Sequence, residues 1–302
     1  MLFLIVLFMG PAAAADFNFG GEAGLGLTDN ANLEDSQRDG DFYVRIAGQV
    51  SSRKGEHAYG ARLGLTDYLR EHSNDVVSWR LYDRWQKNPS AWLIYAALLG
   101  QDYTGGDSGI TDSSFDNFGF DAYGEKTKEL GSRTSLGFGP GLAGRYYTSL
   151  SNRSDHTLYG FAEIDHELSQ KVLLGGRTEL GFLISNDADF SRTYLELSGN
   201  IDYLFRESWN WFSELTIRQT SFTSRTASEE TIVSRRRGRM ARAETVTELE
   251  AHSSLMIYTE VVKKHSSTIE TGASLRHSNQ SSRSGYQNYS ANELYGRIVL
   301  SF

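Results

Sequence analysis

The sequence contains no cysteine, only three prolines and, beyond its first residues, no long apolar run. Without cysteine there can be no disulfide framework, no thiol nucleophile and no cysteine-based zinc site. A membrane-spanning helix needs ~20 consecutive apolar residues, so the pattern excludes a helical membrane protein. No Pro-rich or Ser/Gly-rich linker divides the chain, which favours a single domain.

The composition is polar and rich in glycine and aromatic residues. Apolar residues make up 39% of the chain, the formal net charge is −8, and there are 30 glycines, 16 tyrosines and 16 phenylalanines. This apolar fraction is low for a globular core. A membrane barrel with a hydrated, polar lumen has this balance, because only its outer face needs to be apolar.

The first residues have the character of a secretory signal peptide. The apolar segment 2–9 is followed by Pro11 and by four alanines that end at Ala15. The segment is shorter than the ~20 residues of a membrane anchor. We therefore expect residues 1–15 to be a cleaved signal peptide and residues 16–302 to form the mature domain. For an acidic, exported chain we expect no nucleic-acid partner.

Downstream of the signal peptide, apolar and polar residues alternate with a period of two. In one segment Phe42, Val44 and Ile46 alternate with Tyr43 and Arg45. This period places the two sets on opposite faces of a β-strand, one toward lipid and the other toward water. Helical spacing is not sustained anywhere. The sequence predicts an all-β fold, a transmembrane antiparallel up-and-down β-barrel.

About fourteen segments carry this alternation and are predicted as strands. They are 17–28, 41–51, 57–67, 76–86, 91–102, 115–124, 133–147, 156–166, 171–185, 191–205, 208–220, 244–259, 266–278 and 290–302.

The connections alternate between long and short, as extracellular loops and periplasmic turns do in outer-membrane barrels. Since the first connection, 29–40, is long, both termini are expected on the periplasmic side. Two connections break the alternation, because 125–132 is long for a turn and 186–190 is short for a loop. Barrels of twelve or sixteen strands therefore remain compatible with the pattern.

The last predicted strand has an apolar face that ends on the terminal aromatic residue. This face comprises Leu294, Gly296, Ile298, Leu300 and Phe302. It resembles the C-terminal signal read by the outer-membrane barrel assembly machinery. We therefore expect the chain in the outer membrane of a Gram-negative bacterium, in contact with its lipid and lipopolysaccharide and with that assembly machinery.

Four tryptophans flank predicted periplasmic turns, where the aromatic girdle of a barrel would meet the membrane interface. They are Trp85, Trp92, Trp209 and Trp211.

If the apolar face is outside, a mixed set of charged residues points into the barrel and is predicted to line a pore. The set comprises Arg45, Arg62, Arg145, Arg177, Arg218, Arg276, Arg297, Glu163, Asp165, Glu179, Glu196, Asp202, Glu214, Glu248, Glu260, Glu270 and Glu293. The first half supplies mainly arginine and the later strands most of the carboxylates. Opposite walls of opposite sign would create a transverse field that orients hydrated solutes. The alternative is an interior closed by salt bridges.

The connection at 221–243 carries the strongest basic cluster in the sequence. Its arginines include Arg235, Arg236, Arg237, Arg239 and Arg242. Guanidinium groups bind phosphate and carboxylate in a bidentate manner. This stretch is consistent with four roles. It could contact lipopolysaccharide phosphates, form an anion-selective constriction, bind an acidic polymer, or be a plain solvated loop.

No catalytic or metal motif stands out, and we expect no enzyme activity, metal or cofactor. The segment Arg276, His277, Ser278 and Asn279 is similar to the His-x-Ser-Asn stretch of lipid A deacylases and to the His/Ser/Asn chemistry of the outer-membrane phospholipase. However, His277 and Ser278 are adjacent, so they would point to opposite faces of a strand. Asp107 and Asp112 could bind calcium in their loop, although Asp/Gly-rich segments usually form simple turns.

Both ends of the predicted barrel resemble a known class of outer-membrane barrel. The first hairpin contains Thr28, Asp29, Asn30, Ala31 and Asn32, and the chain ends with Ser278 and Asn279, then Tyr289, Asn292 and the closing strand. This resembles exopolysaccharide-associated outer-membrane barrels and the C-terminal barrel of surface lipoprotein assembly modifiers, which begin with a Thr/Ser-Asp-Asn-x-Asn turn. The resemblance implies a β-barrel that works with polysaccharide or periplasmic export components.

The sequence contains no helical-repeat domain of the kind found in the assembly modifiers, which leaves polymer export or general permeation as the implied functions. Three hypotheses follow. The first is an outer-membrane channel, for an exported polysaccharide or for small hydrophilic solutes. The second is a barrel enzyme that hydrolyses lipid A or phospholipid. The third is a non-conducting structural barrel that presents its basic loop to a partner.

Overall fold

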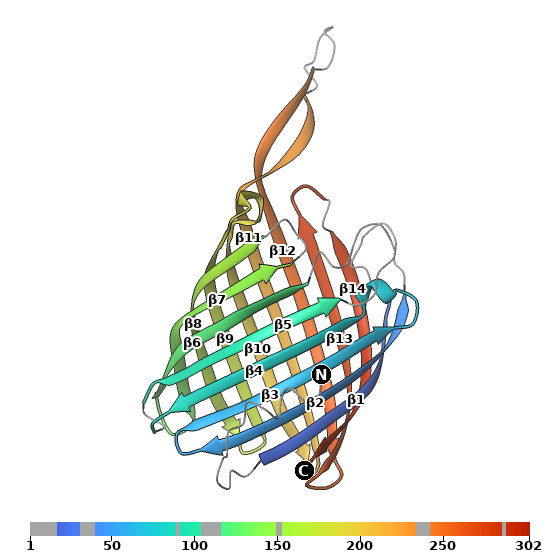
Figure 1. Cartoon of the computed structure of the whole chain (residues 1–302). Helices are drawn as coiled ribbons and strands as arrows, with labels where there is room; N and C mark the ends of the chain where they lie inside the picture. The colour runs from blue at the N-terminus through green and yellow to red at the C-terminus, as the bar shows by residue number, and fades with distance from the viewer. Residues whose placement is uncertain are drawn as a thin grey trace.

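The computed structural model describes residues 17–30, 40–88, 91–103, 116–148, 153–233, 242–285 and 288–302. The predicted signal peptide and the Asp107/Asp112 segment lie outside these residues. Fourteen antiparallel strands close a barrel in which each strand pairs with its neighbours in sequence and β1 pairs with β14 (Figure 1). The predicted up-and-down barrel is therefore confirmed, with fourteen strands rather than twelve or sixteen.

The strands agree closely with the segments predicted from the alternation. They are β1 Phe17–Thr28, β2 Asp41–Lys54, β3 His57–Tyr68, β4 Val76–Gln86, β5 Leu93–Tyr103, β6 Asn117–Glu129, β7 Thr134–Tyr147, β8 Ser154–Ser169, β9 Val172–Ser185, β10 Arg192–Arg206, β11 Trp209–Val233, β12 Arg242–Lys264, β13 Ile269–Ser282 and β14 Tyr289–Ser301. Two short 3₁₀ turns, η2 His72–Asn74 and η4 Ala188–Phe190, lie in connections. No helix in the described part of the chain is long and apolar enough to span a membrane.

The connections alternate strictly between the two ends of the barrel. The segment 125–132, predicted as a longish turn, is mostly strand, because β6 continues to Glu129 and only 130–133 connect it to β7. All even-to-odd connections, such as 55–56, 170–171 and 207–208, lie at one end, which we call the short-turn end. β1 begins and β14 ends there, and the longer connections lie at the opposite, long-loop end.

The outer face of the barrel is apolar and exposed. Leu158, Leu180, Leu195 and Ile257 are examples of outward side chains with 43–61% exposure. In a soluble protein such a continuous apolar surface would drive aggregation, whereas lipid chains cover it in a membrane. Outward positions alternate with inward ones along every strand, so the pairing register fixes which side chains face the lumen.

Aromatic side chains mark the short-turn end of the outer face. Trp85 donates a hydrogen bond to Glu56 at 3.0 Å, Trp211 donates one to Thr259 at 2.8 Å, and Trp92 is 42% exposed. These tryptophans and Trp209 occupy outward positions next to short turns, which is the placement predicted for an interfacial girdle.

The segment 221–243, predicted as a loop, is largely strand. β11 continues to Val233 and β12 begins at Arg242, so only 234–241 connect them. Beyond a register shift between Ser221 and Thr226, this hairpin projects past the other strands (Figure 1). The prediction failed because residues 222–233 contain no glycine or proline and are rich in threonine and other β-formers. Arg235, Arg236, Arg237 and Arg239 lie outside the described residues, and Arg242 is the first residue of β12.

The barrel closes where β1 pairs with β14, a pairing that we call the seam. It runs in register from Gly20–Ser301 to Thr28–Glu293. At its long-loop end, Asp29 accepts hydrogen bonds from the Asn292 backbone N–H at 2.6 Å and from its Nδ2 at 2.7 Å. The buried Asn30 donates to the carbonyl oxygen of Ser290 at 3.0 Å. Hydrogen bonds between the Thr-Asp-Asn turn of the first hairpin and the closing strand therefore stabilise this end of the seam.

Replacement of Asp29 by alanine should destabilise the barrel. The change leaves the N–H groups of Asn292 without their charged acceptor, which we expect to lower the free energy of unfolding by about 1 kcal/mol, since the contact is partly solvent-exposed. The measurement is a guanidinium unfolding curve of the refolded barrel, followed by tryptophan fluorescence. Asp102→Ala is the control, because Asp102 on β5 is exposed and makes no contact of this kind. Equal midpoints for the two variants would contradict the role of Asp29.

Candidate functional site

The inner wall carries the charged residues predicted from the sequence. Strand register places all but one of them at inward positions within the barrel. For example, Arg177 on β9 lies opposite Glu163 on β8, and Arg276 on β13 lies opposite Glu293 on β14. The same register turns the large apolar residues of each strand outward.

Glu248 is the exception. Its side chain is 59% exposed and pairs with Arg283 at 3.1 Å, in the connection after the end of β13. Because β12 extends beyond β13 on this side, Glu248 lies above the barrel rim rather than in the lumen. The prediction that this residue lines the lumen was therefore wrong. The reason is the one that made the loop prediction for 221–243 wrong, namely that β11 and β12 extend beyond their neighbours.

Several inward arginines neutralise neighbouring carboxylates. Arg177 binds Glu163 at 3.2 Å and Glu179 at 2.8 Å, and Arg218 binds Glu196 at 2.7 Å. Across the strands nearer the seam, Arg276 pairs with Glu293 at 3.3 Å, Arg297 with Glu260 at 2.7 Å, and Arg62 with Glu22 at 3.5 Å. These pairs lie along the wall, within one strand or between strands at most two positions apart in the ring, so they stabilise the wall without crossing the barrel.

The wall formed by β2, β3 and β4 is basic. It carries Arg45, Arg62, Arg80 and Arg84, and no inward strand position between Phe42 and Tyr103 in the described part of the chain holds a carboxylate. Arg80 and Arg84 were missed in the sequence analysis. The sequence of β4 could have identified them, since both arginines lie on the same face as Tyr82 and alternate with the outward residues Trp79 and Leu81.

The opposite wall is acidic. Carboxylates at inward positions there include Asp165 on β8, Asp202 on β10 and Glu214 on β11, and none of these makes an ion pair with another described residue. In a closed ring of fourteen strands, β10 lies half a turn away from β3. The two walls therefore face each other with opposite charge, the arrangement that creates a transverse field.

Charged side chains inside the barrel remain open to water. The side-chain exposures of the ion-paired arginines are 53% for Arg62, 46% for Arg276, 42% for Arg218 and 37% for Arg177. These residues point away from the lipid-facing surface, so their exposed area faces the lumen. A lumen packed shut by side chains would bury such groups.

Most of the described tyrosines also face inward, a feature that the sequence analysis did not single out. They are Tyr43, Tyr68, Tyr82, Tyr95, Tyr103, Tyr123, Tyr147, Tyr159, Tyr194, Tyr258, Tyr289 and Tyr295. Tyrosine combines an apolar ring with a hydroxyl that binds water or solute. The alternation along each strand could have revealed this, because tyrosine mostly occupies the inward positions, whereas phenylalanine and tryptophan fill most of the outward aromatic positions.

Several of these rings lie flat against glycines of a neighbouring strand. A Cβ atom added to Gly26 would lie 2.0 Å from the Tyr43 ring, and one added to Gly141 would lie 2.1 Å from the Tyr159 ring. Gly24 and Gly181 accommodate Tyr295 and Tyr194 in the same way. This aromatic cover over a glycine supports the curvature of a closed sheet and keeps the ring along the wall.

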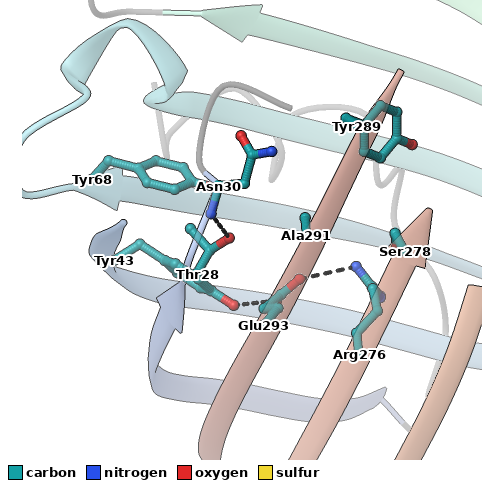
Figure 2. Close-up of a pocket in the computed structure, with 9 residues that line it drawn as sticks. All are labelled: Thr28, Asn30, Tyr43, Tyr68, Arg276, Ser278, Tyr289, Ala291 and Glu293. Atoms are coloured by element: carbon teal, nitrogen blue, oxygen red, sulfur yellow. Dashed lines mark hydrogen bonds and ion pairs between the residues drawn. The ribbon is translucent and has the colours of Figure 1, made fainter. Parts of the chain in front are cut away.

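A cavity of about 210 Å³ opens on the inner wall near the long-loop end of the seam. Figure 2 shows Glu293 at its centre, between the Tyr43 hydroxyl, which donates to it, and the Arg276 guanidinium. Tyr68, Ser278 and Tyr289 lie around Glu293 and Arg276. The cavity therefore combines an anion, a cation, five hydroxyl groups and aromatic rings.

His277 and Ser278 point to opposite faces, as the sequence predicted. His277 contacts the Oδ1 of Asn292 at 2.9 Å on the outer side, whereas Ser278 lines the inner cavity. A base and a nucleophile on opposite sides of a strand cannot exchange a proton directly.

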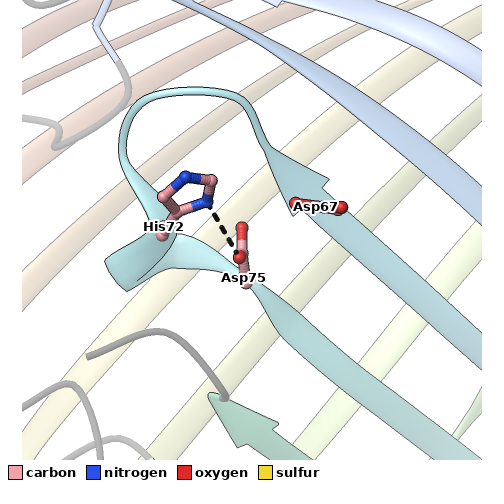
Figure 3. A group of neighbouring side chains, drawn as sticks. All are labelled: Asp67, His72 and Asp75. Atoms are coloured by element: carbon pink, nitrogen blue, oxygen red, sulfur yellow. Dashed lines mark ion pairs between the residues drawn. The ribbon is translucent and has the colours of Figure 1, made fainter.

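Asp67 near the end of β3 and His72 and Asp75 in the connection to β4 lie together, with potential ligand atoms within 4.8 Å of one another (Figure 3). His72 lies 3.4 Å from Asp75, and Asp75 accepts the Tyr68 backbone N–H at 2.6 Å. Asp41, which is almost fully buried, accepts the backbone N–H groups of Arg70 and Glu71 in the same connection. These contacts give the carboxylates a role in shaping the turn.

Comparison with solved structures shows what the chain resembles. A bacterial polysaccharide outer membrane secretin superposes with a TM-score of 0.55 and 12% identity, over 94% of this chain and 97% of that one. OmpT, an outer membrane protein of Vibrio cholerae, gives a TM-score of 0.51 and 8% identity, over 98% and 99%. The fold is that of an outer-membrane β-barrel. No protein-family model matches the sequence, and no curated protein matches it either.

Replacement of Gly26 by alanine should distort the upper lumen. The new methyl group would displace the Tyr43 ring and break the hydrogen bond of Tyr43 to Glu293, and we expect overpacking to cost about 1–3 kcal/mol. The shift is measured as the change in guanidinium midpoint of the refolded barrel. Gly48→Ala serves as the matched control, because a Cβ at Gly48 on the adjacent strand meets no atom within 4 Å. If both alanines were tolerated equally, the packing of Tyr43 on Gly26 would not be a stabilising contact.

Proposed function

We propose that this protein is a water-filled channel of the outer membrane that admits hydrophilic solutes. The observation that carries the proposal is the exposure of charged side chains within the closed barrel, such as Arg62 and Arg276. Fourteen strands enclose more space than inward side chains usually fill. The ion pairs follow the wall rather than bridging the lumen, so they leave a path open.

The transverse arrangement of charge supports the same proposal. The basic wall of β2–β4 faces carboxylates on β8–β11 across the lumen. Such a field favours dipolar, hydrated and polyhydroxylated solutes over apolar ones of the same size, because the apolar ones would displace oriented water. A lipid-hydrolysing barrel would require a nucleophile and a base on one face, and His277 and Ser278 do not offer this.

A polysaccharide is the polymer that we favour for this channel. The Thr-Asp-Asn turn resembles the opening of exopolysaccharide-associated barrels, and one structural neighbour is a bacterial polysaccharide outer membrane secretin. The inner wall supplies tyrosine rings and hydroxyl groups, which suit sugars. We propose the Gram-negative outer membrane as its location, with lipopolysaccharide around it and the barrel assembly machinery and periplasmic export components as partners.

Removal of the basic wall should change ion selectivity. In planar bilayers, we expect the double variant Arg80→Ala with Arg84→Ala to conduct with an anion-to-cation permeability ratio lower by roughly twofold to fivefold. That factor corresponds to the ~0.5–1 kcal/mol of a charge interaction in a hydrated pore. The reversal potential in a salt gradient reports this ratio.

Arg133→Ala is the control for this experiment, because Arg133 is an exposed residue in the turn between β6 and β7. Its reversal potential should match that of the wild type. Absence of any conductance from correctly folded wild-type barrel would contradict the proposed function, whereas unchanged selectivity in the double variant would remove the basic wall from it.

A further inference from the structure

We infer that the lumen holds an acidic saccharide chain along the seam, in a row of three adjoining cavities. This inference rests on the proposed function and names its substrate class. The row consists of the upper cavity of Figure 2, a middle cavity of about 250 Å³ and a lower cavity of about 180 Å³. All three open on the inner face of the strands on either side of the seam.

The cavities adjoin one another, because neighbours share lining residues. Arg276 and Glu293 line both the upper and the middle cavity. Glu22, Arg62 and Arg297 line both the middle and the lower one. Along β14 the row extends from Tyr289 to Val299, about 33 Å at ~3.3 Å per residue. An extended chain of several sugar rings fits such a row better than a single compact ligand does.

The charge of the row indicates an anionic ligand. Arg62, Arg276 and Arg297 have carboxylate partners, whereas Arg45 in the middle cavity has none among the described residues. Its Nε donates only a long hydrogen bond, 3.4 Å, to Thr66, and its guanidinium lies 5.4 Å from the Tyr295 ring centre. A guanidinium held over an aromatic ring with free N–H groups is a bidentate site for a carboxylate.

The upper cavity adds groups that recognise sugar hydroxyls. The hydroxyls of Tyr68, Ser278 and Tyr289 line it and make no hydrogen bond to another described residue, while Glu293 and Arg276 offer an acceptor and a donor. The rings of Tyr43 and Tyr295 stack at 5.9 Å along the wall between the upper and middle cavities. Both rings are buried, at 2% and 6% exposure, so they shape the wall rather than offer a free face to a ligand. A uronic-acid chain combines a carboxylate for Arg45 with hydroxyl groups for the polar side chains of the upper cavity.

The test is calorimetric titration of the mature, refolded barrel in detergent with a galacturonate hexamer. We expect saturable binding that weakens as salt is raised, because ion pairing contributes to it. Arg45→Gln should weaken binding about tenfold, the factor that one lost charged hydrogen-bond pair produces. Arg133→Gln is the control, since Arg133 is an exposed residue in the turn between β6 and β7 and lines none of the three cavities, and its affinity should stay within a factor of two of the wild type.

Two further ligands test the chemistry, namely neutral maltohexaose and hexaglutamate. Both should bind at least tenfold more weakly than the galacturonate hexamer. The inference is overturned if the hexamer does not bind, if either comparison ligand binds equally well, or if Arg133→Gln weakens binding as much as Arg45→Gln. Bilayer conductance is recorded on the same preparation. A barrel that conducts without binding the hexamer refutes only the saccharide row, and one that binds it without conducting refutes only the channel.

Discussion

Closure of the sheet between its first and last strands is the constraint on which the rest of the structure depends. In a lipid environment an open sheet edge would leave a row of N–H and C=O groups without partners, at a cost of several kcal/mol each. The seam from Gly20–Ser301 to Thr28–Glu293 satisfies these groups, and Asp29 and Asn30 fix its end to Asn292 and Ser290. Once the ring is closed, the register decides which residues meet lipid and which meet water.

Closure also brings residues from distant parts of the sequence together on the inner wall. Tyr43 on β2 reaches Glu293 on β14 across β1 because Gly26 leaves room for its ring. Arg297 on β14 lies between Glu22 on β1 and Glu260 on β12. The row of cavities therefore lies along the seam, where the two ends of the chain meet, and its charges and hydroxyl groups come from strands that are adjacent only in the closed barrel.

The alternation of apolar and polar residues predicted most of this fold, because in a membrane barrel one face of each strand meets lipid and the other meets water. It placed all fourteen strands and the inward parity of Arg45, Arg177 and Arg276. It failed for 221–243, where a polar stretch without a lipid-facing side continues as a paired hairpin, and consequently for Glu248. Contacts between strands, such as Arg297 with Glu260, depend on register and on shear around the ring, which no local pattern specifies. The unpaired state of Arg45 could be seen only after those contacts were known.

The central claim, that the inner wall is in contact with water inside a lipid-facing barrel, can be tested directly because the chain has no native cysteine. Single cysteines at Ser198 and Leu197, neighbours on β10 with inward and outward parity, would be exposed to a charged, membrane-impermeant thiol reagent in lipid vesicles. The account predicts rapid labelling of Ser198→Cys and protection of Leu197→Cys. Protection of both would mean that the lumen is closed to water, and labelling of Leu197→Cys alone would mean that the two faces are assigned the wrong way round.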